Sequence, residues 1–385
     1  MEIAIGVGRE KEGFKAGKGA ASEAAKKIKK PSLIILFSST SLNIPDVLRG
    51  VKDVFTDCQI IGCSSSKEIA FDRVLDNSCV LMAISSSLTI KTGVGRDFSK
   101  DGRKAGEELA NSLIEGVKEP RGTLFLFSDG VSGNGTQMVK GIYNVLGPNV
   151  NVVGGAAGDN CQFLKTYQII NNEVLSDSIV GALILSDAPI VGVGIKHGFT
   201  PYGDPMVITK AEGNRIHQLD GKPAFDAYLS HFKLKEKIEP DDFRKIEETH
   251  THPLGSPQMR EEYLIRHFVC ANPDRSITCS AELLPNSVVR VMKATKNSLI
   301  SAASEAANEA FASLRGKKPK AVLIFNCISR VWILNDEAER EIDEVKNVFG
   351  EDIPLFGFYT FGEISQLKEG PPLFHNKTIV VGAIV

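Results

Sequence analysis

The sequence predicts an α/β fold in two halves, built from repeated strand–helix–strand units with mixed sheets. Three apolar runs, ILF at 35–37, LFLF at 124–127 and VLIF at 322–325, each precede a helical segment and a second short strand. A small-residue turn follows, and a polar loop then leads into another apolar segment, at 79–84, 179–185 and 378–385. Such repeats indicate parallel strands whose C-terminal ends share one edge, where ligands bind in open α/β sheets.

The first two units share one predicted layout. A helix opens each unit, at 15–29, where it is Ala-rich, and at 102–113. A continuous apolar strand follows, as expected of strands buried on both faces. Each unit continues with a second helix and a second strand, at 44–55 and 59–61 in the first unit and at 139–146 and 151–153 in the second.

The pattern changes between about 197 and 294, where Pro, Gly and charged residues are denser and strands alternate in the antiparallel manner. We expect surface loops or an insert over the charged stretch 233–262. The third unit follows, with helices at 298–314 and 338–349 around its apolar strand. We place the domain boundary at 195, which gives an N-terminal domain 1–195 and a C-terminal domain 196–385.

Composition narrows the class of protein. The chain has 385 residues, 42% of them hydrophobic, and a formal net charge of −2, so no basic excess points to nucleic acid. No apolar run approaches the roughly 20 residues of a membrane span, and the N-terminus lacks a secretory apolar segment. The seven cysteines show no CxxC pair. We therefore expect a cytoplasmic protein with reduced thiols.

The glycine-rich turns have two readings each. Gly154, Gly155 and Asp159 follow a strand as a phosphate loop would, but the pattern is not GxGxxG. A tight turn that needs positive φ and a close backbone approach is the simpler reading. The segment 132–135 precedes a helix and could offer N–H groups to an anion. Ser64 and Ser65 suggest a nucleophile, although G-x-S-x-G is absent and turn serines are the simpler reading.

The third unit carries the most specific candidate site. Arg330 comes just after an apolar strand, where its planar fork would suit a carboxylate or phosphate, while a structural ion pair with Glu363 is the alternative. Cys327 lies beside this guanidinium, which would lower the pKa of a thiol, although a small buried hydrophobe is the simpler reading. An acid follows each glycine turn, as Glu68, Asp159 and Glu363. The expected ligand-binding residues are Arg330, Glu363, Tyr359, Thr360, Cys327, Gly154, Gly155, Asp159, Ser64 and Ser65.

The seven histidines do not form a metal motif. His250 and His252 lie two residues apart, but no HExxH or third ligand is near them, and the other histidines stand singly. No cofactor, metal or catalytic triad is predicted.

Several motifs in order give the chain a family resemblance. These are VGGAAGD at 153–159, HGFTP at 197–201, LDGKPA at 219–224, FNCISR at 325–330 and IPLFGFYTFGEI at 353–364, with Ser329 where glycine is expected. On these residues the chain resembles the FIST (F-box and intracellular signal transduction) proteins over almost its full length. It would then comprise an N-terminal and a C-terminal FIST region, matching the two predicted domains.

The resemblance implies a non-catalytic sensory module that binds a small ligand, with amino acids or related metabolites proposed. The resemblance also implies a signalling partner, because family members are often joined to, or encoded beside, kinases, chemoreceptors or cyclic-dinucleotide enzymes. We therefore expect this chain to signal to such a partner in trans. Two alternatives stay open: a small-molecule enzyme that uses Cys327 or Glu363, and a haem-based gas sensor as in one branch of the family.

Overall fold

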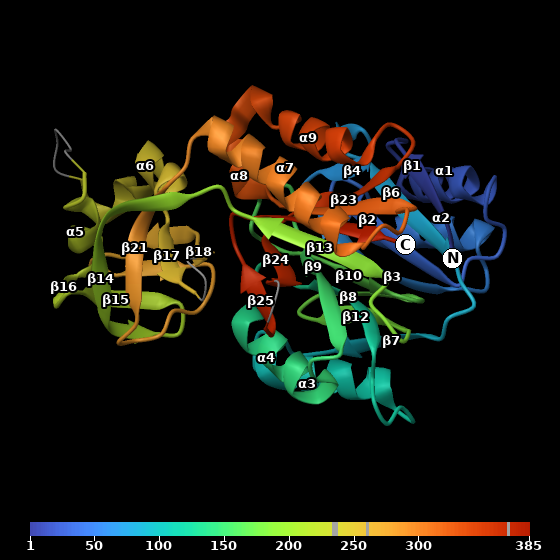
Figure 1. Cartoon of the computed structure of the whole chain (residues 1–385), viewed down its shortest axis with the longest axis horizontal. Coiled ribbons are helices and arrows are strands. Elements are labelled where there is room, and N and C mark those ends of the chain that lie inside the picture. Colours follow the sequence, from blue (N-terminus) through green and yellow to red (C-terminus); the bar gives the residue numbers. More distant parts are fainter. Residues whose placement is uncertain (233–237, 259–261, 368–369) are drawn as a thin grey trace.

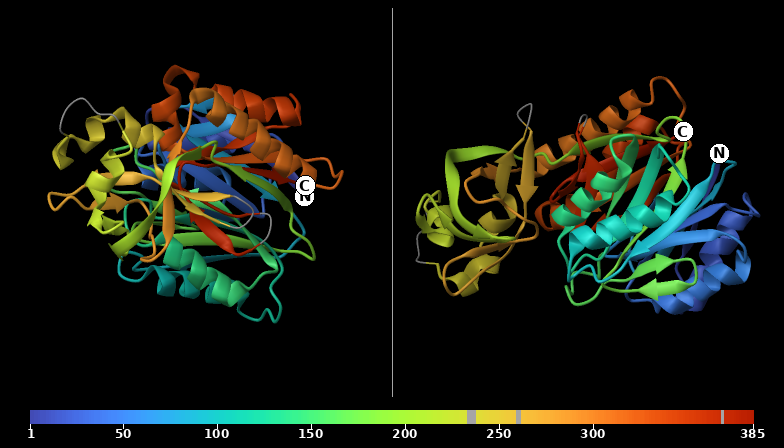
Figure 2. Two further views of the ribbon diagram at one scale, coloured as in Figure 1. Left: turned by 60° about the vertical axis from the view of Figure 1, so that its left-hand side comes forward. Right: turned by 90° about the horizontal axis from the view of Figure 1, so that it is seen from below.

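The computed structural model describes residues 1–232, 238–258, 262–367 and 370–385. It contains a main body of three six-stranded mixed sheets and a smaller body with an eight-stranded antiparallel sheet (Figures 1 and 2). The predicted α/β class with mixed sheets is confirmed. Both chain ends lie close together, at the end of the main body farthest from the smaller one (Figure 1).

The three sheets of the main body share one strand order, with a parallel pair at the centre and antiparallel strands on both sides. The first consists of β1 (Glu2–Gly8), β6 (Cys79–Ser85), β2 (Leu33–Ser39), β3 (Gln59–Ser65), β10 (Gln168–Ile170) and β11 (Glu173–Leu175). The second consists of β7 (Ile90–Gly95), β12 (Ile179–Leu185), β8 (Gly122–Ser128), β9 (Val150–Ala156), β24 (Gly362–Gln366) and β25 (Pro372–His375). The third consists of β13 (Val191–Lys196), β26 (Ile379–Ile384), β22 (Ala321–Cys327), β23 (Leu355–Thr360), β4 (Glu68–Phe71) and β5 (Arg73–Leu75).

Each sheet receives its last two strands from a different part of the chain. Hairpin β4–β5 follows the first sheet's strands but pairs with β23, while β10–β11 pairs with β3 and β24–β25 pairs with β9. The sequence units therefore do not close on themselves. Similarly, β13 straddles the predicted boundary at 195 and pairs with β26 near the C-terminus.

Helices cover the outer face of every sheet of the main body. The outer faces pack against small and aliphatic side chains of these helices, such as Ala20 in the first layer and Ala306 in the third. The pairs are α1 (Gly13–Ala25) with α2 (Ile44–Val54), α3 (Gly102–Ile114) with α4 (Gly135–Leu146), and α7 (Lys296–Ser313) with α9 (Arg340–Phe349).

The inner faces of the three sheets meet in one common apolar core. Because side chains alternate along a strand, each continuous apolar run feeds two cores, one under the helices and one at the centre. Phe37, Phe127 and Phe325 occupy matching positions on β2, β8 and β22. Their ring centroids lie 5.1 to 6.3 Å apart, in edge-on or tilted contacts that aromatic pairs favour.

The recurrent glycines lie where two parallel strands approach closely. Gly62, Gly154 and Gly357 each pair with a residue of the neighbouring strand, and an added Cβ would come within 1.9 Å of that residue's carbonyl oxygen. These glycines have no positive φ, so the turn expected at Gly154 is wrong, while the close approach expected there is confirmed.

The smaller body is inserted between β13 and α7. Its strands are β14 (Thr200–Glu212), β15 (Arg215–Leu219), β16 (Lys222–Pro223), β17 (Leu254–Pro257), β18 (Tyr263–Arg266), β19 (Phe268–Ala271), β20 (Ile277–Cys279) and β21 (Val288–Lys293). Within the stretch predicted as loops, 233–237 and 259–261 lie outside the described residues. The described part there contains η1 (Pro240–Lys245) and α6 (Glu247–Thr251). The smaller body also contains a short helix, α5 (Ala224–Leu229).

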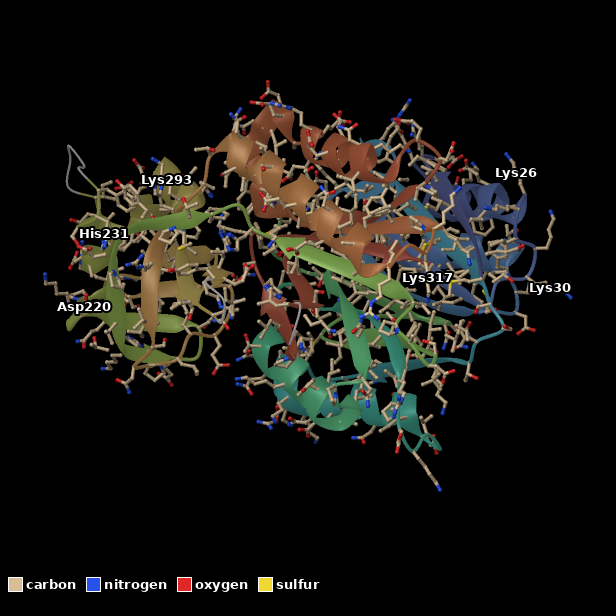
Figure 3. All side chains as sticks on the ribbon, in the orientation of Figure 1. Lys26, Lys30, Asp220, His231, Lys293 and Lys317 are labelled. Carbon is tan, nitrogen blue, oxygen red and sulfur yellow. The ribbon has the colours of Figure 1, made fainter. Side chains whose placement is uncertain are left out.

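Side chains that carry nitrogen and oxygen atoms project from the surface of both bodies (Figure 3). Lys26, Lys30 and Lys317 are exposed on the main body, as the figure shows. In the described part of the chain, no helix combines the length and the apolar character needed to cross a membrane.

Candidate functional site

The turns after the parallel strands converge at one end of the main body, as the sequence predicts. Ser64 Oγ donates to the carbonyl of Gly158 at 2.7 Å, and the amide of Phe361 donates to the carbonyl of Ala156 at 3.1 Å. Asn160 Nδ2 donates to Ser39 Oγ at 3.0 Å. Turns from all three sheets therefore hydrogen-bond to one another.

The residues predicted to bind a ligand lie in this region, but below its surface. All ten are buried: Arg330, Glu363, Tyr359, Thr360, Cys327, Gly154, Gly155, Asp159, Ser64 and Ser65. Ser64 and Ser65 bond to a backbone carbonyl and to Glu68, so they are not the solvated serines expected of an open turn. These ten residues therefore lie beneath the candidate site, and other residues form its exposed surface.

Two buried carboxylates occupy matching places in exchanged hairpins. Glu68 accepts from Ser65 Oγ at 2.5 Å and from the amide and hydroxyl of Ser78. Glu363 accepts from Thr360 Oγ1 at 2.6 Å and from the amide and hydroxyl of Thr378. Each carboxylate thereby joins the start of a hairpin to the start of the strand that closes the unit.

The third matching position holds an amide rather than an acid. Glu68 pairs with Phe358 and Glu363 with Gly155, each one residue after a close-approach glycine, and Gln168 pairs with Cys63 in the same way. The predicted equivalence of Asp159 with the two glutamates is therefore wrong. The loop after β9 is longer, which moves the matching residue from the turn to Gln168.

Burial raises the pKa of Glu68 and of Glu363 to about 7, against the opposing effect of their hydrogen bonds. Neither side chain is exposed, and the oxygen atoms of both are engaged by the protein. An exchange of protons with a substrate at Glu363, as the enzyme alternative requires, has no open path in this arrangement.

Arg330 is a structural residue that joins several segments. It lies in α8 (Ile328–Leu334), is fully buried, and donates Nε and Nη2 to the Glu341 carboxylate. Its remaining N–H groups donate to three backbone carbonyls, at 2.8 to 2.9 Å, of His197, Leu299 and Lys377. All five N–H donors of a guanidinium are thus used.

This arrangement corrects two expectations for Arg330. Its ion-pair partner is Glu341 of α9, not Glu363. No donor is left for a ligand carboxylate or phosphate, so the predicted anion contact at Arg330 does not fit the structure. The carbonyls that it binds belong to the start of the segment into the smaller body (His197) and the return from it (Leu299), so Arg330 fixes both connections.

Cys327 lies beneath the surface, next to other buried polar groups. Burial raises the pKa of its thiol to about 12, with a further contribution from Glu363, and Sγ lies 3.2 Å from Ser329 Oγ. The thiol is therefore protonated at neutral pH, which disfavours the predicted nucleophile. Lys377 is also fully buried; burial lowers its pKa to about 8, and its Nζ donates to the carbonyl of His250 at 3.0 Å.

Asp159 organises a strained loop at the surface. Its carboxylate, which is almost fully buried, accepts from the amides of Phe163, Leu164 and Lys165 at 2.7 to 3.1 Å. Asn160, Cys161 and Phe163 have φ of 55°, 62° and 55°. Left-handed backbone is an outlier for a bulky residue, and such strain gathers at ligand clamps and switch regions. The loop presents two apolar side chains to solvent, with Phe163 47% and Leu164 77% exposed.

Phe163 belongs to a cluster of aromatic rings, hereafter the aromatic cluster, formed by Phe163, Phe361, Trp332, His250 and His267. Phe163 stacks on Phe361 with centroids 4.7 Å apart and contacts Trp332 at 6.3 Å. Trp332 in turn contacts His250 at 5.4 Å and His267 at 5.8 Å. The two histidines come from the smaller body and the other rings from the main body, so the cluster spans the junction of the two.

Other contacts at this junction are both apolar and polar. Ile265 and Met292 of the smaller body share a buried apolar cluster with Ile333 and Leu334 of the main body. Arg266 of β18 is buried and donates Nη1 to the carbonyl of Phe374 in β25 at 3.0 Å. Ser280 Oγ donates to Asn376 Oδ1 at 2.7 Å, and the buried Nδ1 of His250 has no hydrogen-bond partner among the described residues. Burial lowers the pKa of His250, which keeps its imidazole neutral.

The sequence did not reveal the aromatic cluster. Trp332 is the chain's one tryptophan, and it lies two residues from Arg330, which was a usable signal. His250 was considered only as a metal ligand. Among the described residues, no three His, Cys, Asp or Glu side chains gather closely enough to hold a metal ion.

Comparison with protein families identifies two regions. Residues 32–222 match the FIST N domain, and residues 224–366 match the FIST C domain. These matches meet near residue 223, beside β16, whereas the predicted boundary lies at 195.

Relatives with similar sequences carry no described function. An uncharacterised protein of Methanocaldococcus jannaschii is 26% identical over 310 residues, which are 74% of this chain and 57% of that protein. An uncharacterised protein of Mycobacterium bovis is 24% identical over 100% of this chain and 99% of its own length, and one of Mycobacterium tuberculosis is 25% identical over 98% and 96%. The chain thus spans little more than half of the first relative.

A solved structure with a weak likeness is PurLQS from Thermotoga maritima. It is 10% identical, covers 100% of this chain and 72% of its own, and has a TM-score of 0.23. A similarity this low supports no conclusion about fold or function.

The buried acids predict a measurable dependence of stability on pH. The pKa of Glu68 is about 7 in the folded protein and 4.5 ordinarily, so the folded state binds more protons between these values. Wild type should therefore lose stability, relative to Glu68→Gln, as pH rises from about 5 to 8, by on the order of 1–3 kcal/mol. Urea unfolding of both proteins at pH 5 and pH 8 measures this difference.

Gln168 shows that this position accepts an amide, so Glu68→Gln should fold. Glu119→Gln, on the surface, is the matched control and should run parallel to wild type. Parallel curves for wild type and Glu68→Gln would contradict the assignment.

Arg330→Lys should destabilise the protein, because lysine keeps the charge but has three donors where arginine has five. We expect a loss of on the order of 3 kcal/mol in the free energy of unfolding. The control is Arg340→Lys at an exposed ion pair with Glu337, where the expected change is within about 0.5 kcal/mol. Denaturant unfolding compares the two variants. Equal losses in the free energy of unfolding would contradict the role of Arg330 in holding the two connections to the smaller body.

Proposed function

Since this chain belongs to the FIST family, whose domains are sensors in signal transduction, we propose that it binds a small ligand at the aromatic cluster. The ligand class is an amino acid or a related metabolite, and the output is a partner protein acted on in trans. One observation carries the proposal: rings from the main body and the smaller body meet at a strained, exposed loop.

The chemistry of the cluster suits a small molecule with a cationic and an apolar part. Faces of Trp and Phe attract ammonium groups and apolar side chains, and a neutral imidazole adds a hydrogen-bonding nitrogen. Phe163 and Trp332 offer the faces, and the unpartnered Nδ1 of His250 offers the nitrogen. An amino acid combines an ammonium, a carboxylate and a side chain within this size.

A ligand at the aromatic cluster would contact both bodies, and this gives a route by which binding could change the protein's conformation. A ligand that touches both Phe163 and His250 has contacts that depend on how the smaller body sits against the main body. It therefore favours one arrangement over another, which is the requirement for a ligand to shift a conformational equilibrium. The junction combines a buried apolar cluster, polar contacts and the hydrogen bonds of Arg330, so a ligand that alters its packing would alter how the two bodies sit against each other. A kinase, chemoreceptor or cyclic-dinucleotide enzyme would read the change.

Phe163→Ala should weaken ligand binding about tenfold or more, because an aromatic anchor of an interface commonly contributes over 1 kcal/mol. Calorimetric titration of wild type and variant, with a panel of free amino acids, measures the loss. Phe311→Ala is the matched control, since Phe311 is 48% exposed on α7 and contacts Phe349 rather than the cluster. Equal affinities of wild type and Phe163→Ala for every amino acid that binds would move the site elsewhere.

A further inference from the structure

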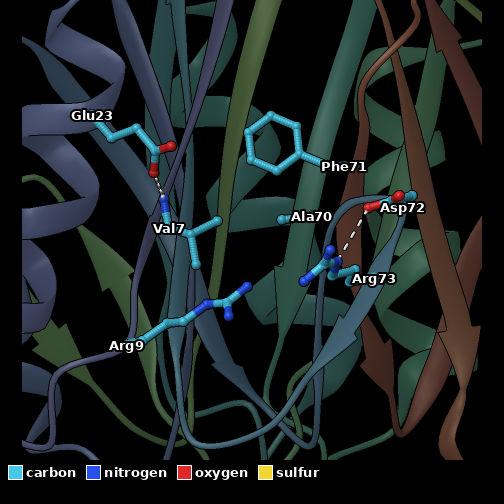
Figure 4. A pocket seen from close by; sticks show the side chains of 7 residues that line it. All are labelled: Val7, Arg9, Glu23, Ala70, Phe71, Asp72 and Arg73. Atoms are coloured by element: carbon cyan, nitrogen blue, oxygen red, sulfur yellow. Dashed lines mark hydrogen bonds and ion pairs between the residues drawn. The ribbon is translucent and has the colours of Figure 1, made fainter. Parts of the chain in front are cut away.

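A second candidate site lies at the opposite end of the main body. A surface pocket of about 400 Å³ opens there between β1 and the tip of hairpin β4–β5 (Figure 4). It is far from the aromatic cluster, since Phe71 at the tip pairs with Leu355, the first residue of β23, while Thr360 ends that strand. Its size falls in the usual range for small-molecule pockets. The lining residues are Val7, Arg9, Glu23, Ala70, Phe71, Asp72 and Arg73.

The aromatic residue at the tip, Phe71, has a strained backbone conformation. Ala70 pairs with Arg73, so Phe71 and Asp72 form a two-residue turn, and Phe71 has φ of 60°. A bulky residue rarely adopts this conformation, which glycine and asparagine tolerate. Phe71 is nevertheless 41% exposed, so burial of its ring does not account for it.

A matching hairpin shows what the turn needs for folding alone. Ile170 pairs with Glu173, so Asn171 occupies the same place in hairpin β10–β11, with φ of 50°. There the asparagine side chain serves the fold, because it accepts from the amide of Ile60 at 3.1 Å. The fold is therefore satisfied by Asn at this position, and Phe71 replaces it at a conformational cost.

The two hairpins also differ in charge: an arginine faces a glutamate at β10–β11, whereas two arginines face each other across the pocket at β4–β5. Arg9 and Arg96 occupy matching positions. Arg9 follows the last residue of β1, which pairs with the first residue of β6, and Arg96 follows the last residue of β7, which pairs with the first residue of β12. Arg96 forms an ion pair with Glu173 at 2.8 Å, which neutralises that site. The position matching Glu173 is Arg73, so two guanidinium groups face the pocket from opposite sides (Figure 4).

Two acids also line the pocket, and one of them, Asp72, forms an exposed ion pair with Arg73. Glu23 accepts from the amide of Val7 at 2.8 Å, and the Asp72 carboxylate lies 3.6 Å from Arg73 Nε with both side chains more than half exposed. No ion pair of the Arg9 side chain occurs among the residues that the structure describes.

We propose that this pocket binds a small anion attached to a planar ring, with the anion between Arg9 and Arg73 and the ring against Phe71. A guanidinium fork matches both phosphate and carboxylate oxygens, and an aromatic face suits a flat apolar or heterocyclic group. A nucleoside monophosphate and an aromatic carboxylate share this chemistry. The site is independent of the aromatic cluster and of the sensor function proposed for it.

The test is calorimetric titration of the full chain with adenosine 5′-monophosphate and with 2-naphthoate, compared with inorganic phosphate and adenosine. We expect at least one of the two ring-bearing anions to bind at least about tenfold more tightly than inorganic phosphate or adenosine. Tighter binding of the nucleotide identifies a phosphate ligand, and tighter binding of 2-naphthoate identifies a carboxylate ligand.

Two variants copy the matching hairpin and should keep the fold. Arg73→Glu restores the Arg–Glu pair and should weaken the anion at least about tenfold. Phe71→Asn should weaken it similarly while raising Tm, because the strain is relieved. Arg96→Gln, at the matching hairpin, should bind as wild type does. The proposal is overturned if neither ring-bearing anion binds more tightly than inorganic phosphate and adenosine, or if wild type, Arg73→Glu and Phe71→Asn bind equally.

Discussion

The Arg330–Glu341 pair is the interaction on which the junction of the two bodies depends. A buried charge is costly unless it is paired and its donors are satisfied, and here one guanidinium meets a carboxylate and three carbonyls. Those carbonyls belong to the outgoing connection, the returning connection and the loop that leads into β26. The pair therefore couples the position of the smaller body to the third sheet and to helix α9.

Lys377 extends this coupling toward the surface. Its carbonyl accepts from Arg330, while its ammonium donates to His250 of the smaller body. His250 then contacts Trp332, which lies in the same helix as Arg330. Buried polar contacts and surface rings thus form one continuous set of contacts, so a ligand at the rings would act on a junction that is already tightly specified.

The three similar sheets leave room for a different candidate site at each end of the main body, the aromatic cluster at one end and the pocket beside Phe71 at the other. Three sheets of equal strand order pack on a common phenylalanine core, and exchanged hairpins lock each sheet to the next. The requirements of this packing are strict at the close-approach glycines and at the Glu68, Gln168 and Glu363 positions. They are loose at hairpin tips and loops, where Phe71 and Phe163 differ from what folding alone requires.

The sequence predicts the parts of this structure that depend on local pattern. Continuous apolar runs such as 33–37 became strands buried on both faces, and the glycine turns did converge at one end. The role of Arg330 was not predictable, because its carbonyl partners come from segments more than 30 residues away in the sequence. Asp159 was mistaken for the match of Glu363 because the loop after β9 is longer than the other turns. The residue that pairs at the matching position is therefore Gln168, which lies farther along the chain. The aromatic cluster was missed because its rings come from five separate segments.

The most direct test of the sensor account is native mass spectrometry of the full chain, followed by fluorescence. Since Trp332 is the one tryptophan, its emission reports on the aromatic cluster without labelling. The account predicts a small molecule bound to the protein as purified, released by unfolding, whose return to the emptied protein changes Trp332 emission in a saturable way. A bound molecule that leaves the emission of Trp332 unchanged at saturation would contradict a ligand site at this cluster.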